Sequence, residues 1–306
     1  MNTETIHFLD VQEIDSRKWN ECVNTSIFGI PKLCYVQYDY LNAICENQWG
    51  ALVIFDQKKE LYKNVMPLPY RKKWGMVHYV YQPYFCQQLG VFGASTEFDI
   101  NDFISHIPRK FLRVHLNVHV EFGIPRKSQK RTNYILLAPH IPENTFNKDA
   151  LKNLKKLRQH EIEYVETTNY QVVLTIYDEA WGEQSGFEWF NDYAAFAKAL
   201  SVLSSDRIYA VIVRDKNTSE ELGGAIFLHS GDETAHSHRL HYVCGGAVKR
   251  GREWGVVHGI IEHVCLKFPH STIDFEGSNI PSVAKFYQKF GPIDEPYYSI
   301  SINYRL

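Results

Sequence analysis

The strongest constraint on the fold of this 306-residue chain is an order of strands and helices that occurs twice. In each half, strand patterns of the antiparallel kind are followed by strands that alternate with helices. The second half closes with helices expected at 254–268 and 281–290, each between two strands. Two strands joined through a helix run parallel, so the sheet must be mixed. We therefore predict an α+β fold of two tandem domains, residues 1–143 and 144–306, each a mixed, mostly antiparallel sheet flanked by helices.

The remaining elements follow from hydrophobic periodicity. Further helices are expected at 34–46, 98–107, 147–160 and 187–203. Strands are expected at 51–55, 62–67, 77–81, 111–122, 133–137, 171–177, 208–214, 222–229, 239–243, 272–275 and 297–304. Pro139, Pro142 and Asn144 mark the boundary between the two domains. The last strand is free, in this scheme, to pack against the N-terminal domain.

Charge is distributed unevenly along the chain. The whole sequence has 33 basic and 35 acidic residues, a net charge of -2, which excludes a protein that binds polyanions through its overall field. Residues 109–158, however, hold twelve basic and three acidic side chains. This basic belt is either a solvated helix face with a linker or a groove for a ligand that carries phosphate.

Composition narrows the class further. With 44% hydrophobic and 22% charged residues, the chain can bury a large core and is not disordered. Its apolar runs are too short to span a membrane, and no export signal is visible at the N-terminus. Six cysteines without a CxxC pair are expected to be reduced, buried thiols. These features predict a cytoplasmic protein.

The segment from Ile273 to Gly291 contains the most chemistry. A buried strand ends at Glu276-Gly277 and leads into a helix that Ser278 or Asn279 is expected to cap. In sheets with parallel crossovers, ligands bind at the carboxyl ends of strands, next to helix N-termini. The sequence therefore predicts a ligand site at this strand end.

This segment resembles the GNAT acyltransferase superfamily. The resemblance lies in Asn279, Ala284, Tyr287 and Gly291, which stand in the order of the family's last crossover with one extra residue in the helix. It implies that Tyr287 lies beside the sulfur of coenzyme A and protonates the departing thiolate. The alternative for Tyr287 is an aromatic core residue whose hydroxyl meets water.

The wider chain is similar to the Fem-type (FemAB-like) branch, in which two GNAT domains are fused. The similar segments are 67–73, 81–90, 130–134, 152–156 and 274–277. Fem-type enzymes that use aminoacyl-tRNA tend to carry Phe-Lys where this chain has Phe286-Tyr287. The resemblance therefore implies an N-acyltransferase that moves an acyl or aminoacyl group from acetyl-CoA or another acyl-CoA to a small-molecule or peptidyl amine.

Two other functions remain open under this resemblance. One is a tRNA-dependent Fem-type peptidyltransferase that acts on cell-wall precursors, for which tRNA is the less favoured partner. The other is a GNAT-like protein that binds a ligand without turnover.

The resemblance also implies a site for the coenzyme's pyrophosphate after strand 239–243. Arg252 and Gly255 match the first half of the GNAT phosphate pattern, but Val257 stands where Gly or Ala belongs. The residues expected to bind the coenzyme are Gly245, Gly246, Lys249, Arg250, Gly251, Arg252, Gly255 and Asn279.

Two further questions concern acid–base and metal chemistry. Glu276, at the end of a buried strand, is expected to deprotonate the attacking amine, and its alternative role is to cap the following helix. His229, His236, His238 and His241 lie close together in sequence, but no HExxH or CxxC motif accompanies them. We expect no metal there.

Overall fold

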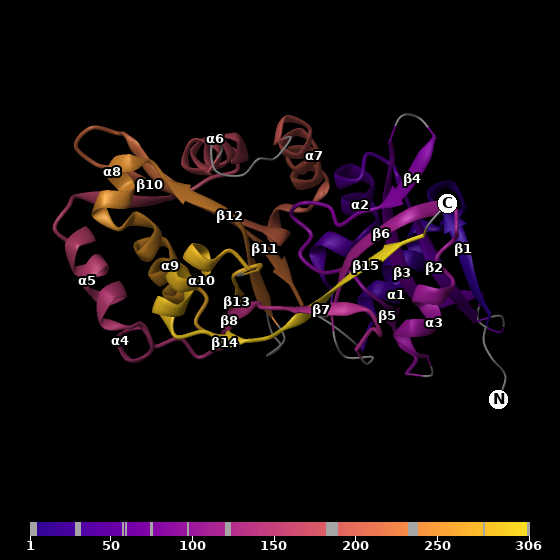
Figure 1. Ribbon diagram of the computed structural model, residues 1–306. Coiled ribbons are helices and arrows are strands. Elements are labelled where there is room, and N and C mark those ends of the chain that lie inside the picture. Colours follow the sequence, from indigo (N-terminus) through magenta and orange to yellow (C-terminus); the bar gives the residue numbers. More distant parts are fainter. Residues whose placement is uncertain are drawn as a thin grey trace. The chain divides into compact units, whose positions relative to one another are not determined.

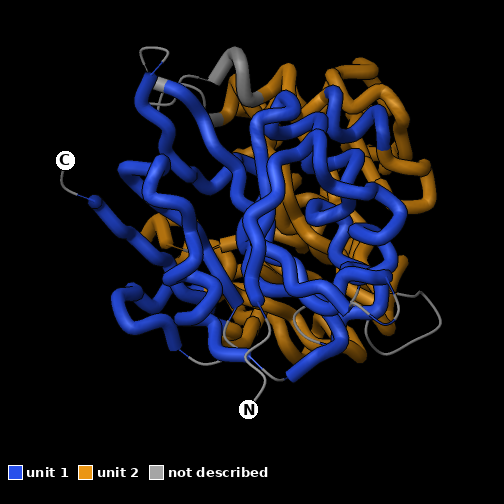
Figure 2. Tube along the Cα trace, turned by 90° about the vertical axis from the view of Figure 1, so that its right-hand side faces the viewer, with its two compact units in different colours: residues 1–132, 198–202, 296–306 blue, residues 133–197, 203–295 orange. Residues whose placement is uncertain are grey.

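The computed structural model describes residues 5–27, 32–56, 58, 60–73, 76–96, 98–119, 124–181, 189–231, 238–277 and 279–304. The chain divides into two compact units, shown in different colours in Figure 2. The first comprises residues 1–132, 198–202 and 296–306, and the second comprises residues 133–197 and 203–295. The first break between the units lies at 132/133, whereas the sequence places the domain boundary after residue 143.

The first unit is built on one mixed sheet. Its described strands are β1 (Ile6–Asp10), β2 (Trp49–Asp56), β3 (Leu61–Lys73), β4 (Val77–Val80), β5 (Phe92–Gly93), β6 (Phe111–Val118), β7 (Ser128–Arg131) and β15 (Tyr297–Asn303). Their order is β1-β2-β3-β4-β6-β15-β7, with β5 paired to β3. The helices are α1 (Ser16–Asn24), α2 (Tyr38–Ile44) and α3 (Ile100–Ser105). The last strand, β15, therefore lies between β6 and β7.

The second unit has a sheet of its own. Its described strands are β8 (Tyr134–Leu136), β9 (Ile162–Glu166), β10 (Ile208–Asp215), β11 (Glu221–Ser230), β12 (Arg239–Ala247), β13 (Thr272–Asp274) and β14 (Ile293–Asp294). The helices are α4 (Pro142–Thr145), α5 (Lys148–Leu157), α6 (Tyr170–Trp181), α7 (Trp189–Val202), α8 (Lys249–Trp254), α9 (Val256–Lys267) and α10 (Pro281–Tyr287). The strand order is β14-β8-β13-β12-β11-β10-β9.

Helices cover both faces of this second sheet (Figure 1). Two adjacent glycines of β11 allow the close approach, because a side chain on Gly224 would meet Val173 of α6 and one on Gly223 would meet Val256 of α9. Neighbouring residues of a strand point to opposite faces. Thus α6 and α9 lie on opposite faces of the sheet, and β11 and β12 run through the core between them.

The parallel crossover expected near the end of the chain is present. Strand β12 passes through α9 into β13, and the two strands pair in parallel only from Arg239–His241 to Thr272–Asp274. Beyond that point β12 continues to Ala247, whereas β13 ends. The two strands therefore separate directly after His241 and Asp274, next to the predicted ligand site.

Several sequence predictions need correction. Residues 171–177 form helix α6 rather than a strand, and α1, β1 and β9 were not expected. The β-branched residues of 171–177 favour a strand, but Val173 and Ile176 are buried at helical spacing against the sheet, and this packing outweighs propensity. The N-cap of α10 is Ile280 rather than Asn279, and Ser278 lies outside the described residues.

Two other expectations concern cysteines and membranes. All six cysteines are free and buried, as predicted. Among the described residues, the helices include none that combines the length and apolarity needed to cross a membrane.

Candidate active site

The strand end at β13 has an unusual backbone. Glu276 has φ of +52° and Gly277 has φ of +96°, so two successive residues occupy the left-handed region. A residue with a Cβ adopts this conformation at a cost in energy, which surrounding contacts must offset. The contacts are present: the Glu276 N–H donates to Asp274 Oδ1 at 2.9 Å, and the Gly277 N–H donates to Asn133 Oδ1 at 3.0 Å. The loop is therefore held in place by two buried side chains.

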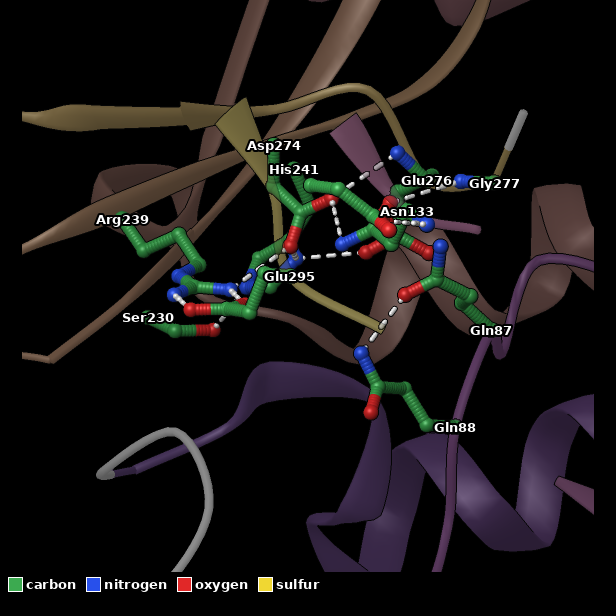
Figure 3. A network of polar contacts seen from close by, with 11 residues as sticks. Gln87, Gln88, Asn133, Ser230, Arg239, His241, Asp274, Glu276, Gly277 and Glu295 are labelled. Atoms are coloured by element: carbon green, nitrogen blue, oxygen red, sulfur yellow. Dashed lines mark hydrogen bonds and ion pairs between the residues drawn. The ribbon is translucent and has the colours of Figure 1, made fainter. Parts of the chain in front are cut away.

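Asp274 anchors a network of polar side chains (Figure 3). Asn133 Nδ2 donates to its Oδ1 at 3.0 Å, and Arg239 Nη1 donates to its Oδ2 at 2.8 Å. The same guanidinium also donates to both carboxylate oxygens of Glu295, at 2.6 and 2.9 Å. Because Asp274 is fully buried, its charge is tolerated only with such partners.

Glu276 is paired with His241 on the neighbouring strand. Its Oε1 lies 2.5 Å from His241 Nδ1, and His241 Nε2 lies 2.9 Å from Ser230 Oγ. Burial raises the pKa of Glu276 above its ordinary value, and the adjacent His241 opposes that rise. A carboxyl group whose pKa is raised is a stronger base than an ordinary carboxylate, which suits it to accept a proton from a substrate.

Ser230, His241 and Glu276 are the residue types of a serine hydrolase triad. The Ser230 side chain, however, is completely buried on the far side of the imidazole from Glu276. A nucleophile must reach its substrate. This arrangement therefore does not present a serine nucleophile.

Tyr287 lies in α10, where the parallel strands separate. Its ring stacks on Phe275 with the centroids 4.3 Å apart, and it meets Tyr242 of β12 edge to face at 6.3 Å. Burial, with Tyr177, Glu276 and Asp274 nearby, raises the pKa of Tyr287 above its usual value. The hydroxyl makes no hydrogen bond to the described part of the chain, and the residue is 9% exposed. Tyr287 thus keeps its proton at neutral pH.

Comparison with solved structures defines the architecture. FemX matches with a TM-score of 0.62 and 10% identity, over 95% of this chain and 96% of that chain. A tandem GNAT protein from the clavulanic acid biosynthesis pathway matches with a TM-score of 0.51 and 10% identity, over 97% and 98%. The chain has a tandem GNAT fold of the Fem-like kind.

Further comparisons show how much can be concluded from this structural likeness. N-myristoyltransferase of Saccharomyces cerevisiae, with bound myristoyl-CoA, matches with a TM-score of 0.53 and 10% identity, over 100% of this chain and 80% of that chain. No protein-family model matches the sequence, and no curated protein sequence matches it significantly. At such low identity the likeness shows the fold and leaves the chemistry to the site.

Most of the glycines expected at the coenzyme site have roles in the fold itself, in strand pairing, close packing or a helix junction. Gly245 and Gly246 belong to β12 and pair with Ala225 and Gly224 of β11. Gly251 packs against the backbone, because a Cβ there would lie 2.0 Å from the Leu222 carbonyl oxygen. Gly255 has φ of +88° and joins α8 to α9.

The predicted cations differ from one another. Arg250 forms ion pairs with Asp215 and Glu220 and lies over the Trp254 ring at 4.4 Å. Lys249 and Arg252 are exposed, and Arg252 also donates to the Ala247 carbonyl oxygen. Asn279 is exposed after the Glu276 loop. A phosphate-bearing ligand would therefore find Lys249 and Arg252 at the surface, while Arg250 is already neutralised.

The histidine group does not converge on one point in the described residues. His229 Nδ1 contacts His238 Nε2 at 3.0 Å, His241 turns to Glu276, and His236 lies outside the described residues. One atom each of His241, Asp274 and Glu276 lie within 4.8 Å of one another, a spacing that could hold a cation. Arg239 and the Glu276 N–H already bind Asp274, and His241 binds the Glu276 carboxyl group, so we interpret the group as a hydrogen-bond network.

The sequence misses most of this network. It singles out Glu276 and Tyr287, but it assigns no role to Asn133, Arg239 or Glu295. One signal was available: Asp274 and Glu276 are two carboxylates at alternate positions of a buried strand end. Their partner His241 becomes visible only through the parallel register of β12 with β13.

Proposed function

We propose that this protein is an N-acyltransferase that moves an acyl group from a thioester, an acyl-CoA, to an amine. The observation that carries the proposal is the juxtaposition, where β12 and β13 separate, of a carboxyl group with a raised pKa and a tyrosyl hydroxyl without a hydrogen-bond partner among the described residues. One can accept a proton and the other can donate one, as aminolysis of a thioester requires.

The chemistry balances with these two groups. The amine nitrogen attacks the carbonyl carbon, a C–N bond forms, and its surplus proton passes to Glu276. The C–S bond breaks, and the thiolate takes the proton of Tyr287. Protonation of Glu276 also removes one of the negative charges that raise the pKa of Tyr287, which makes Tyr287 a better donor at the moment it is needed. A proton passed back from Glu276 to Tyr287 resets the site.

Direct attack by the amine fits the residues better than a covalent intermediate. Cys244 interacts electrostatically with Tyr242 and Tyr177, but it is buried and burial raises the pKa of its thiol. A nucleophilic cysteine needs a lowered pKa and access to substrate. The acyl group therefore passes straight from donor to acceptor.

The first test is the variant Tyr287→Phe. With acetyl-CoA and a panel of primary amines, we expect kcat for thiol release to fall ~10- to 1,000-fold, because only the proton donor is removed. Tyr164→Phe is the control, since it makes the same change in the half-buried strand β9. Unchanged turnover in Tyr287→Phe, with an active parent protein, would remove Tyr287 from the mechanism.

An aminoacyl-tRNA donor is the second candidate, and the exposed surface of α5 favours it. Lys148, Lys152, Lys155 and Lys156 are all exposed on this helix. Binding to nucleic acid through such lysines weakens steeply with salt. Retention of tRNA on a filter at low salt and its loss at high salt, without thiol release from acyl-CoA, would favour this donor over the first.

A further inference from the structure

His241 occupies a closed position between two polar partners in the second unit. It is completely buried, and both ring nitrogens are engaged: Nδ1 with Glu276 Oε1 at 2.5 Å and Nε2 with Ser230 Oγ at 2.9 Å. The proposed reaction uses Glu276 and Tyr287 and gives His241 no role. A buried imidazole beside the proposed base therefore needs an explanation.

The contact with Glu276 selects one tautomer of His241. A carboxylate oxygen accepts hydrogen bonds, so the Nδ1 that faces ionised Glu276 must carry a proton. Nε2 of the neutral ring then has only a lone pair, and the Ser230 hydroxyl can donate to it. Glu276 thus fixes which nitrogen bears the proton, and the Ser230 hydroxyl satisfies the other nitrogen.

Burial and the neighbouring carboxylate of Asp274 oppose the ionisation of Glu276, whereas His241 and Arg239 favour it. Asp274, two residues earlier on β13, is a second carboxylate, and its side-chain oxygens are directed to Arg239, Asn133 and the backbone. Arg239 shares its charge between Asp274 and Glu295. Tyr287 on α10 faces Glu276 as a neutral phenol, and His229 on β11 faces His241. Of these groups, His241 makes the direct hydrogen bond to the Glu276 side chain.

We propose that His241 is a positioning residue that keeps Glu276 ionised and oriented for proton abstraction, by donating its Nδ1–H to Oε1. The inference rests on the proposed role of Glu276 as the base. It explains how a carboxylate remains charged in a buried site that also contains Asp274. It also explains how the left-handed Glu276 backbone is held, because the side chain is tied to a rigid central strand.

The test measures the protonation of Glu276 directly. Carbon-13 NMR of protein labelled at the glutamate carboxyl carbons gives the signal of Glu276, which the variant Glu276→Gln identifies by its loss. In His241→Leu, which has no donor, we expect the pH midpoint of that signal to rise by about one unit or more relative to the parent protein. An unchanged midpoint in a folded His241→Leu protein would overturn the proposal.

Two matched variants keep the test decisive if His241→Leu does not fold. His241→Asn places an amide near the position of Nδ1, toward Glu276. His241→Gln places an amide near the position of Nε2, toward Ser230. We therefore expect the midpoint in His241→Asn to stay close to that of the parent, and the midpoint in His241→Gln to rise. Equal midpoints in the two variants would contradict the proposed role of Nδ1.

Kinetics separate this inference from the proposed function. In an acyl-CoA assay, the acid limb of the kcat/KM profile should move to higher pH in His241→Gln and remain in place in His241→Asn. If the NMR midpoints behave as expected but Glu276→Gln keeps full turnover, the base role of Glu276 fails while the control of its charge by His241 stands. If turnover requires Glu276 but no midpoint moves, the inference about His241 fails alone.

Discussion

Glu276 combines a strained backbone with a carboxyl group whose pKa is raised by burial. Either feature by itself occurs in structural positions, but strain that buried partners sustain is concentrated at functional sites. Here the partners are Asp274 and Asn133, which bind the loop N–H groups, and His241, which binds the side chain. Their contacts fix both the direction and the charge of one carboxylate.

His258 offers a residue-scale prediction about acid stability. It lies in α9 between Phe286 and Phe290, its Nε2 is buried without a hydrogen bond, and burial lowers its pKa to about 4. The folded state thus binds this proton less readily than the unfolded chain, whose histidines titrate near pH ~6.5. Its contribution to the free energy of unfolding is complete above pH ~6.5 and is lost as the pH falls toward 4, by about 3 kcal/mol.

The variant His258→Phe tests this prediction. A phenyl ring suits the aromatic surroundings and cannot be protonated, so the fall in Tm between pH 7 and pH 4.5 should be smaller than in the parent protein. His270→Gln, at an exposed histidine, serves as the control and should leave the pH dependence unaltered. An equal loss of Tm in parent and His258→Phe proteins would contradict the assignment.

What sequence reveals about single residues depends on where their partners lie. Tyr287 and Glu276 can be singled out because the strand, turn and helix around them form one continuous segment. Asn133 lies 141 residues before its partner Asp274, so no local pattern joins them. The sequence therefore predicts site residues that share one continuous segment, but not partners that are distant in sequence.

At the scale of elements, predictions succeed where local sequence determines the structure and fail where distant contacts determine it. Strand β6 shows clear alternation of buried and exposed side chains and is predicted correctly from it. Helix α6 is predicted as a strand because its local residues, rich in Val and Ile, favour one. Its helical state depends on packing against β11 and β12, where Gly224 allows the approach. Propensity fails where tertiary contacts determine the outcome.

Gly251 gives a prediction at this scale. It lies in α8, and a methyl group on it would collide with the Leu222 carbonyl oxygen of β11, which is backbone and cannot move aside. We expect Gly251→Ala to lower the free energy of unfolding by about 1 to 3 kcal/mol, measured by urea denaturation. Glu253→Ala, at an exposed position in the same helix, is the control. Weaker donor binding with unchanged stability would instead assign Gly251 to the phosphate site.

At the scale of the whole molecule, the two units differ in how continuous they are in sequence. The second unit is formed by residues 133–295, apart from a short part of α7, whereas the first depends on the distant segment 296–306. That segment contains β15, whose ladder with β6 extends from Tyr298 to Asn303 and whose other edge pairs with β7. The first sheet therefore contains an internal strand, next to the edge strand β7, that comes from a distant part of the sequence.

Removal of residues 296–306 tests this dependence. Without β15, strands β6 and β7 have no partner between them, so their amide hydrogens should exchange at least ~100-fold faster. Amides of β11 in the second unit supply the internal control and should keep their protection. Protection of β6 that survives the truncation would show that the first sheet does not need β15.

The position of β15 also affects how the protein forms on the ribosome. Domains generally fold as they emerge, the N-terminal one first, at about 5–20 residues per second. Here the first sheet has a vacant place until Tyr297–Asn303 have been translated, whereas β8 to β14 precede that segment in the sequence. The strands of the second unit are thus all synthesised before the first sheet can be completed, and until then β6 and β7 each expose the edge that pairs with β15.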